Sequence, residues 1–93
     1  MDDDVLYSEA RFYIKLKEYD KAISAFEDII ENYPEEIRCD NAIFELAQLY
    51  ELRLDQKDKA KELYEKLFID YSNSTFAIEA RKRFRILRGD DIQ

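Results

Sequence analysis

Few residues in this chain of 93 could carry out acid–base or nucleophilic chemistry. There is no histidine, so the commonest general acid–base group and metal ligand is missing. The only cysteine, Cys39, therefore has no histidine to activate it as a papain-like nucleophile. We expect Cys39 to be a small buried residue near the start of a helix. A single glycine cannot build a glycine-rich phosphate loop. The sequence predicts a protein that is not an enzyme, with no cofactor and no metal site.

The 22 acidic side chains favour solvated helix faces over a catalytic carboxylate pair. Many can form pairs four residues apart on a helix, as Glu62 can with Lys66. The triplet Asn73, Ser74 and Thr75 fits a glycosylation acceptor, but such triplets are common by chance. We expect Ser74 to cap a helix instead.

Composition predicts one all-α domain over residues 1–93. The chain is 46% hydrophobic and 40% charged, and it has only one Gly and one Pro, too few turn residues for a sheet protein. A net charge of −7 disfavours nucleic acid as a partner. The apolar runs are only a few residues long, so no transmembrane segment is expected. Cytoplasmic and periplasmic locations both stay open.

Apolar spacing predicts five helices joined by short connections, so that neighbours run antiparallel. Their ranges are 4–17, 20–32, 38–54, 58–70 and 75–88. Asp20 and Asp58 stand where a helix N-cap is wanted. Pro34 cannot continue the second helix, and Gly89 suits the C-terminal end of the fifth.

The chain repeats itself. A shift of 37 residues places Ala10 and Tyr13 on Ala47 and Tyr50. A shift of 38 residues matches further positions: Asp20 with Asp58, Ala22 with Ala60, Phe26 with Tyr64, and Tyr33-Pro34 with Tyr71-Ser72. The change of shift falls in the polar stretch 54–57, where one inserted residue costs little.

These residues resemble the tetratricopeptide repeat, a helical hairpin in which small and large residues alternate at fixed positions. The first copy reads Leu6, Glu9-Ala10, Tyr13, Ala22, Phe26 and Pro34, and the second reads Ile43, Leu46-Ala47, Tyr50, Ala60, Tyr64 and Ser72. Glu9 and Ser72 depart from the usual Leu and Pro. The resemblance implies two antiparallel hairpins, about 3–36 and 40–74, and a capping helix at about 75–88. Together they would form a segment of a right-handed α-solenoid.

A longer lead-in between the copies is similar to that of a bacterial envelope-assembly subtype of the family. There, Tyr-Pro, a polar spacer and Ala precede each repeat, and the segments beginning at Tyr33 and Tyr71 both read this way.

The resemblance also implies a concave surface for a protein or peptide partner, called here the inner face. The resemblance places on it Tyr7, Arg11, Ile14, Asn41, Phe44, Gln48 and Glu51, with Asp4 beside them. Exposed Tyr7 and Phe44 rings would hold the partner, and polar neighbours would bond its backbone. The alternative is that both rings simply pack against adjacent repeats. A chaperone-tail clamp of Lys and Asn is not reproduced.

The two ends of the chain differ in character. On a helical wheel, the apolar residues of helix 4–17 cover roughly 220°, far more than an ordinary surface helix. We therefore expect the chain to be the C-terminal part of a longer repeat protein, and a weak homodimer through this helix when isolated. The last helix carries net charge +4 over residues 76–88. Its basic face comprises Arg81, Lys82, Arg85 and Arg88, with Arg83 also placed on the surface. A solvated cap is one interpretation of this face, and contact with an acidic partner, an anionic lipid surface or nucleic acid is another.

The sequence thus predicts a protein–protein interaction or scaffold module without catalysis. The alternative is a purely structural C-terminal cap of a longer solenoid.

Overall fold

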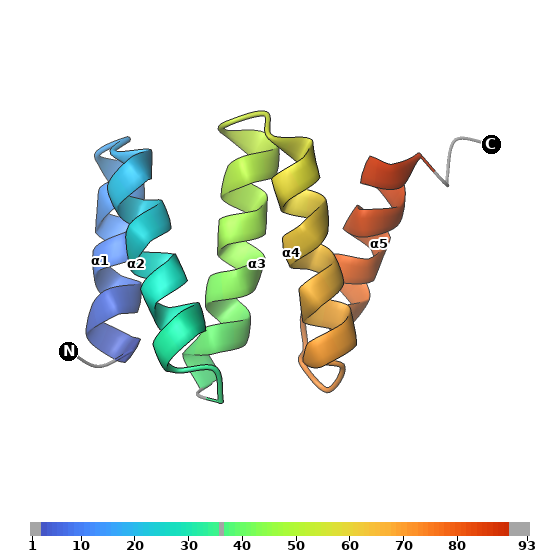
Figure 1. Ribbon diagram of the computed structural model, residues 1–93. Coiled ribbons are helices and arrows are strands. Elements are labelled where there is room, and N and C mark those ends of the chain that lie inside the picture. The colour runs from blue at the N-terminus through green and yellow to red at the C-terminus, as the bar shows by residue number, and fades with distance from the viewer. Residues whose placement is uncertain (1–2, 36, 90–93) are drawn as a thin grey trace. The chain divides into compact units, whose positions relative to one another are not determined.

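The computed structural model describes residues 3–35 and 37–89. The helices run α1 Asp3–Lys15, α2 Tyr19–Asn32, α3 Ile37–Leu52, α4 Lys57–Asp70 and α5 Ala77–Arg88 (Figure 1). They pack pairwise as helical hairpins followed by a C-terminal helix, so the predicted all-α class is confirmed. The chain forms two compact units, Met1–Ala42 and Ile43–Gln93, and each is described by itself. A single domain over 1–93 stays a prediction.

In the first unit, α1 and α2 form an antiparallel hairpin (Figure 1). Ala10 of α1 and Ala22 of α2 are fully buried, as is Phe26 of α2. Methyl-sized side chains let two helix backbones approach closely, and larger rings fill the remaining space. The predicted role of these alanines in close helix packing is therefore supported by their complete burial.

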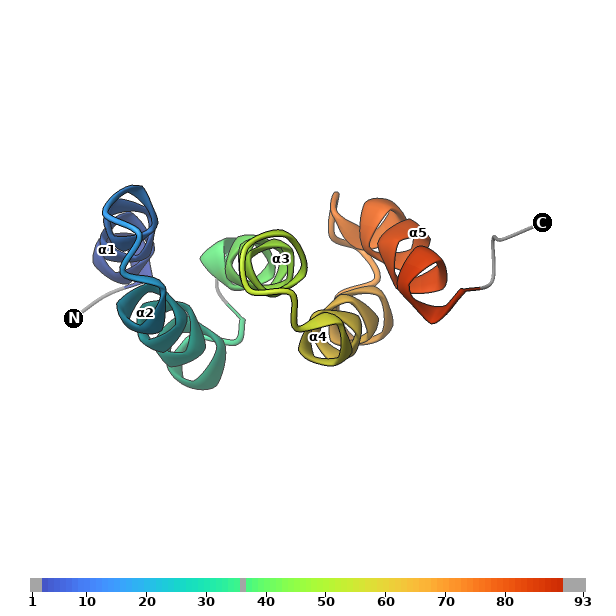
Figure 2. The same ribbon diagram turned by 90° about the horizontal axis from the view of Figure 1, so that it is seen from above.

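The second unit contains the greater part of α3 together with α4 and α5. Within this unit α4 lies beside both other helices when seen from above (Figure 2). Ala47, Ala60 and Tyr64 are completely buried, as their counterparts in the first copy are. These three pairs of equivalent residues thus have the same burial in both units, whereas Tyr13 is half-buried and its counterpart Tyr50 is buried.

The two hairpin turns repeat each other at the level of the backbone. Lys17 and Asp55, 38 positions apart, both adopt left-handed φ values, of 61° and 54°. The N–H of Glu18 then donates to the carbonyl of Tyr13, and the N–H of Gln56 to that of Tyr50. The second span is one residue longer, so the extra residue lies between Tyr50 and Asp55. The predicted one-residue insertion is therefore present, but it lies within residues 51–54, which overlap the predicted stretch 54–57 only at Leu54.

Three predicted helix ends are wrong by two residues. We expected α1 to reach Lys17 and α3 to reach Leu54, but the left-handed turns stop them at Lys15 and Leu52. Non-glycine residues seldom adopt this conformation, and composition gave no sign of it. The fifth helix begins at Ala77 instead of Thr75.

The predicted caps at Asp20 and Asp58 are also wrong. Glu18 and Gln56 hold the N-cap positions of α2 and α4, and neither makes a side-chain capping bond. Asp20 and Asp58 lie in the first turn of these helices. Their charges still favour the positive helix end, but their oxygens do not cap it.

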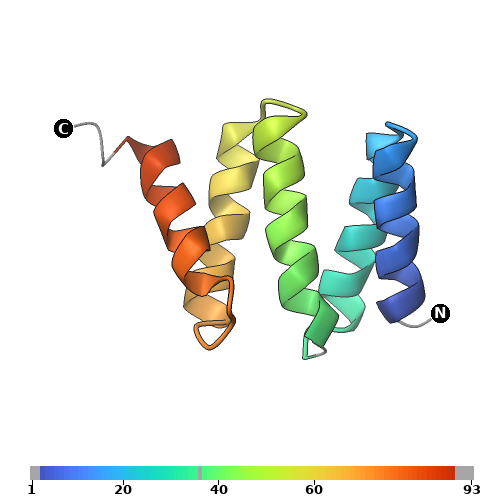
Figure 3. The ribbon, with the colours of Figure 1, turned by 180° about the vertical axis from the view of Figure 1, so that it is seen from behind.

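The loop 71–76 reverses the chain from α4 into α5 (Figure 3). Ser74 Oγ accepts a hydrogen bond of 3.0 Å from the N–H of Phe76. Phe76 itself is the N-cap of α5, so Ser74 caps the preceding turn and not the helix, contrary to the prediction. At the other end Gly89 has φ 91°, and its N–H bonds to the carbonyls of Arg85 and Ile86. The predicted C-terminal role of Gly89 is confirmed.

The first helix has apolar residues on two sides. Leu6, Tyr7 and Ala10 are buried. Val5 and Phe12 of the same helix remain exposed, at 44% and 57%, as does Leu16 at 49%, directly after the helix end, where its N–H still bonds to the Phe12 carbonyl. These three follow one another seven and four residues apart and so share one face, called here the α1 stripe. Apolar residues of this segment thus lie outside its buried side as well as on it.

Candidate functional site

The inner face of the first unit is more closed than predicted. Tyr7 is only 9% exposed, and its ring meets that of Phe26 edge-on with centroids 6.4 Å apart. The prediction of an exposed Tyr7 ring is wrong, because the ring fills the space between α1 and α2. Arg11 is exposed, and its Nη1 donates to the Tyr7 hydroxyl over 3.4 Å. Ile14 is half-buried.

An ion pair joins the first turn of α3 to α1. Arg38 Nε donates to Asp4 Oδ1 at 2.9 Å, and the guanidinium carbon lies 4.9 Å from the centre of the Tyr7 ring. Asp4 is 72% exposed, so the ion pair contributes at most about 1 kcal/mol. Asn41, another predicted inner-face residue, is half-buried in the next turn of α3.

In the second unit, Phe44 belongs to an aromatic cluster. Its ring stacks on Phe76 with centroids 4.8 Å apart and meets Tyr64 edge-on at 5.9 Å. Both geometries are favourable for aromatic pairs. Phe44 was predicted to be exposed, but it is half-buried. Gln48, one turn further along α3, is half-buried as well.

Glu51 is the inner-face position that departs most from its predicted role. Its side chain is only 7% exposed. Arg83 of α5 donates to both carboxylate oxygens, one of them through Nε at 3.3 Å, and the Tyr64 hydroxyl donates to Oε1 at 2.8 Å. These bonds occupy the carboxylate from within the fold. We therefore correct two predictions: Glu51 does not face a partner, and Arg83 does not belong to the solvated basic surface.

The same network affects proton affinities. Burial, followed by the hydrogen bond to Glu51, raises the pKa of the Tyr64 hydroxyl far above its ordinary value. The hydrogen bonds to Glu51 raise the pKa of Arg83. Both groups are protonated at neutral pH even at their ordinary pKa values, and the network makes each hold its proton more tightly.

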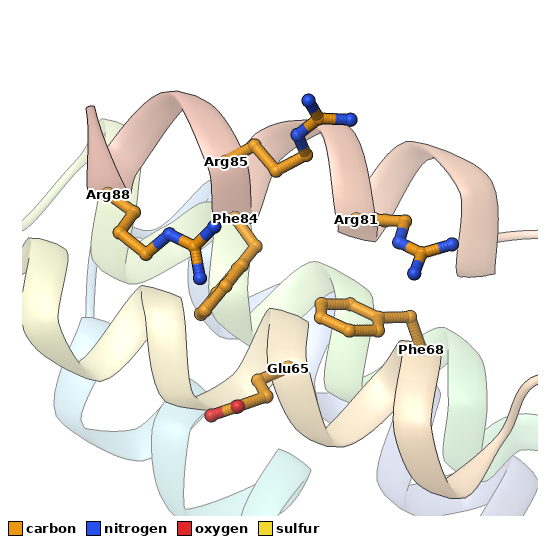
Figure 4. A pocket seen from close by; sticks show the side chains of 6 residues that line it. All are labelled: Glu65, Phe68, Arg81, Phe84, Arg85 and Arg88. Carbon is orange, nitrogen blue, oxygen red and sulfur yellow. The ribbon is translucent and has the colours of Figure 1, made fainter. Parts of the chain in front are cut away.

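A pocket of about 420 Å³ lies between α4 and α5 (Figure 4). It is lined by Glu65, Phe68, Arg81, Phe84, Arg85 and Arg88. The Arg81 guanidinium carbon is 5.6 Å from the centre of the Phe68 ring, and that of Arg88 is 5.1 Å from the centre of the Phe84 ring. The two phenylalanine rings meet edge-on at 5.4 Å. Three of the four predicted basic-face residues thus converge on one pocket.

Lys82, the fourth basic-face residue, is exposed and does not line the pocket. Arg83 follows Phe76 by seven residues and Ala80 by three. Arg83 therefore lies on the same side of α5 as these two apolar residues, and this spacing was a signal in the sequence that its side chain turns inward.

Within the described ranges, no group of three or more Cys, Asp or Glu residues is placed to hold a metal ion. No helix in those ranges is long and apolar enough to cross a bilayer. The side chains of Tyr64, Glu51 and Arg83, which the fold brings together, serve in packing and ion pairing.

The tetratricopeptide repeat profile matches residues 4–36 and 41–74, which is most of the chain. The chain belongs to the tetratricopeptide repeat family. No curated protein and no solved structure matches it. Tetratricopeptide repeats are generally protein–protein interaction modules and are typically non-catalytic. The two matched ranges correspond to the predicted repeats at about 3–36 and 40–74, and each begins within a residue of the prediction.

Proposed function

We propose that this tetratricopeptide repeat chain binds a segment of another protein on its inner face and catalyses no reaction. The observation that carries the proposal is the pair of tandem repeats in which the first helix of each retains partly open polar side chains. Arg11 is exposed on α1, and Asn41 and Gln48 are half-buried on α3. Guanidinium and amide groups can bond the backbone or carboxylates of an extended segment.

The inner-face residues divide into two roles. Tyr7 and Glu51 are held inside the fold and support the surface from below. Arg11, Asn41 and Gln48 supply polar contacts, while half-buried Ile14 and Phe44 offer apolar area beside them. In this division, polar groups determine which segment binds and apolar contacts supply much of the affinity.

The test begins with selection of peptides from a displayed random library against the purified chain. The affinity of a selected peptide is then measured for the Gln48→Ala and Arg11→Ala variants. We expect each to weaken binding about fivefold to tenfold, the effect of losing one hydrogen bond to a charged or polar partner. Glu62→Ala, at an exposed position of α4, is the matched control. If both inner-face variants bind like the wild type, the proposed surface is wrong.

A structural cap is the second candidate function, and the composition of α5 favours it. That helix buries only Ala77 and Ala80 and presents four basic residues to solvent. Terminal repeats of solenoids need a polar outer surface to stay soluble. Ile78, however, is 81% exposed on the same helix, so the outer surface is not polar throughout.

The α1 stripe supports a further part of the proposal, that the chain is the C-terminal part of a longer repeat protein. A preceding repeat would cover Val5, Phe12 and Leu16, and a second copy would cover them weakly in the isolated chain. The two Tyr-led connections, at Tyr33 and Tyr71, support a bacterial envelope-assembly subtype.

A further inference from the structure

The fifth helix departs from the third at one particular set of positions. Tyr33 and Tyr71, 38 residues apart, end α2 and α4 with the same backbone geometry. The same shift pairs the buried Cys39 and Ala42 of α3 with the buried Ala77 and Ala80 of α5. The starts of the two helices are therefore equivalent, and their later residues can be compared directly.

Beyond this point the equivalent residues differ in kind. In α3, Ile43, Ala47 and Tyr50 are buried at 0%, 0% and 6% exposure. In α5 the residues at the same shift are Arg81, Arg85 and Arg88, and all three are exposed. Phe84 and Leu87, the counterparts of buried Leu46 and Leu49, stay apolar and are half-buried. Three positions that carry buried apolar residues in α3 therefore carry a row of exposed arginines in α5.

The arginines are arranged around a hollow. Arg81 and Arg88 point from α5 toward α4, close to the rings of Phe68 and Phe84, whereas the Arg85 side chain points away from the two rings (Figure 4). The contacts with the rings hold two guanidinium groups in place. Neither Arg81 nor Arg85 forms an ion pair with any residue in 3–35 or 37–89.

The charge around the pocket restricts what can bind. Among the described residues that line the pocket, three are arginines and one, Glu65, is a carboxylate, so this lining attracts a small anionic group. Glu62 and Glu79 are exposed on the same two helices, and the whole chain carries −7. A long polyanion would meet this acidic surface, and nucleic-acid binding depends on neutralising many phosphates. The rings of Phe68 and Phe84 also favour a ligand that has an apolar part, which a free anion lacks.

We propose that the pocket formed by Arg81, Arg85, Arg88, Phe68 and Phe84 binds a short acidic segment of a partner protein. Carboxylates of the segment pair with the arginines, and an apolar side chain lies on the two rings. Arginine binds carboxylates through two parallel N–H groups, which adds geometric selectivity to charge attraction. This surface is separate from the inner face, and either proposal can fail without the other.

The test uses a short capped peptide of alternating Glu and Leu, titrated into the whole chain and followed by calorimetry and by amide NMR shifts. We expect the shifts to concentrate on α5 and the end of α4, and the affinity to fall as NaCl is raised. The triple variant Arg81→Gln, Arg85→Gln and Arg88→Gln should lose at least about tenfold in affinity. Lys82→Gln, on the same helix but outside the pocket, should change affinity less than about twofold.

One further variant and three further ligands test whether the binding depends on the arginines and on an acidic peptide. Arg85→Glu alone, at an exposed position, should weaken binding without disturbing the helix, and circular dichroism verifies the fold of each variant. A peptide of alternating Gln and Leu should bind far more weakly than the acidic one. Inorganic phosphate and phosphatidylserine vesicles should also bind more weakly. The proposal is overturned if phosphate, vesicles or the Gln peptide equal the acidic peptide, or if the arginine variants bind it unchanged.

Discussion

Arg83 of α5 forms an ion pair with Glu51 of α3, 32 positions earlier in the chain, while Tyr64 of α4 donates to the same carboxylate. Three helices of the second unit thus meet at one nearly buried charge. A carboxylate so little exposed to water is tolerated only when it is paired and hydrogen-bonded. Among the described residues, every buried side-chain polar atom has a partner.

Removing one side of this pair should be costly. Arg83→Met leaves the buried Glu51 carboxylate without its cation, and we expect about 2–3 kcal/mol of stability to be lost because Arg83 is itself partly exposed. The double variant Glu51→Leu with Arg83→Met should recover most of that loss. Urea unfolding measures both, and Lys82→Met is the control on the same helix. Equal losses for Arg83→Met and Lys82→Met would contradict the role assigned to the pair.

The raised pKa of Tyr64 predicts a base-induced loss of stability. Below pH 10.0, the ordinary tyrosine value, both folded and unfolded states keep the hydroxyl proton, so this group adds no pH dependence. Above it the unfolded state releases the proton while the folded state retains it, so stability falls as pH rises. The slope from this one group approaches about 1.4 kcal/mol per pH unit. Unfolding of Tyr64→Phe, measured across the same range, should show a shallower slope than the wild type.

Close helix approach at the buried alanines should not tolerate enlargement. Ala10→Leu and Ala47→Leu each insert a branched side chain where exposure is zero, and we expect a loss of about 1–3 kcal/mol. Ser8→Leu, at an exposed position of α1, controls for the added apolar surface and should change stability by less than about 0.5 kcal/mol. Thermal unfolding followed by circular dichroism compares the three variants.

Exposure of the α1 stripe predicts concentration-dependent self-association. Sedimentation equilibrium of the isolated chain should show a weak dimer, and Phe12→Glu should abolish it by placing charge in the contact. Ile69→Glu is a closely matched control, because Ile69 is 59% exposed and Phe12 is 57% exposed. A chain that stays monomeric at millimolar concentration, or a dimer equally sensitive to both variants, would contradict the assignment to α1.

Much of the fold followed from spacing alone. The positions of Ala10, Ala22, Ala47 and Ala60 predicted close packing, and all four are fully buried. A helical period and a repeated order of small and aromatic residues specify which faces meet, because both depend on side-chain size and direction. The helix ends were harder. Lys17 and Asp55 take left-handed conformations set by the geometry of the hairpin. Lysine has no intrinsic preference for this conformation that would have predicted it from the sequence.

The candidate surfaces were predicted less well than the helices. Family spacing placed Tyr7 and Glu51 on the inner face, but their burial depends on Phe26 and Arg83, which lie far away in sequence. Charge alone likewise grouped Arg83 with Arg81 and Arg85, although one points inward and the others line a pocket. Pairings between distant side chains are a property of the folded chain, and a single sequence does not display them.

The burial of Cys39 gives the molecule a reporter of its own. It is the only sulfhydryl in the chain, it lies in the first unit and none of its surface is open to solvent. A thiol-specific reagent can therefore react only when that part of the protein opens. The rate at which Cys39 reacts under native conditions would therefore measure local opening of the first unit without any introduced label.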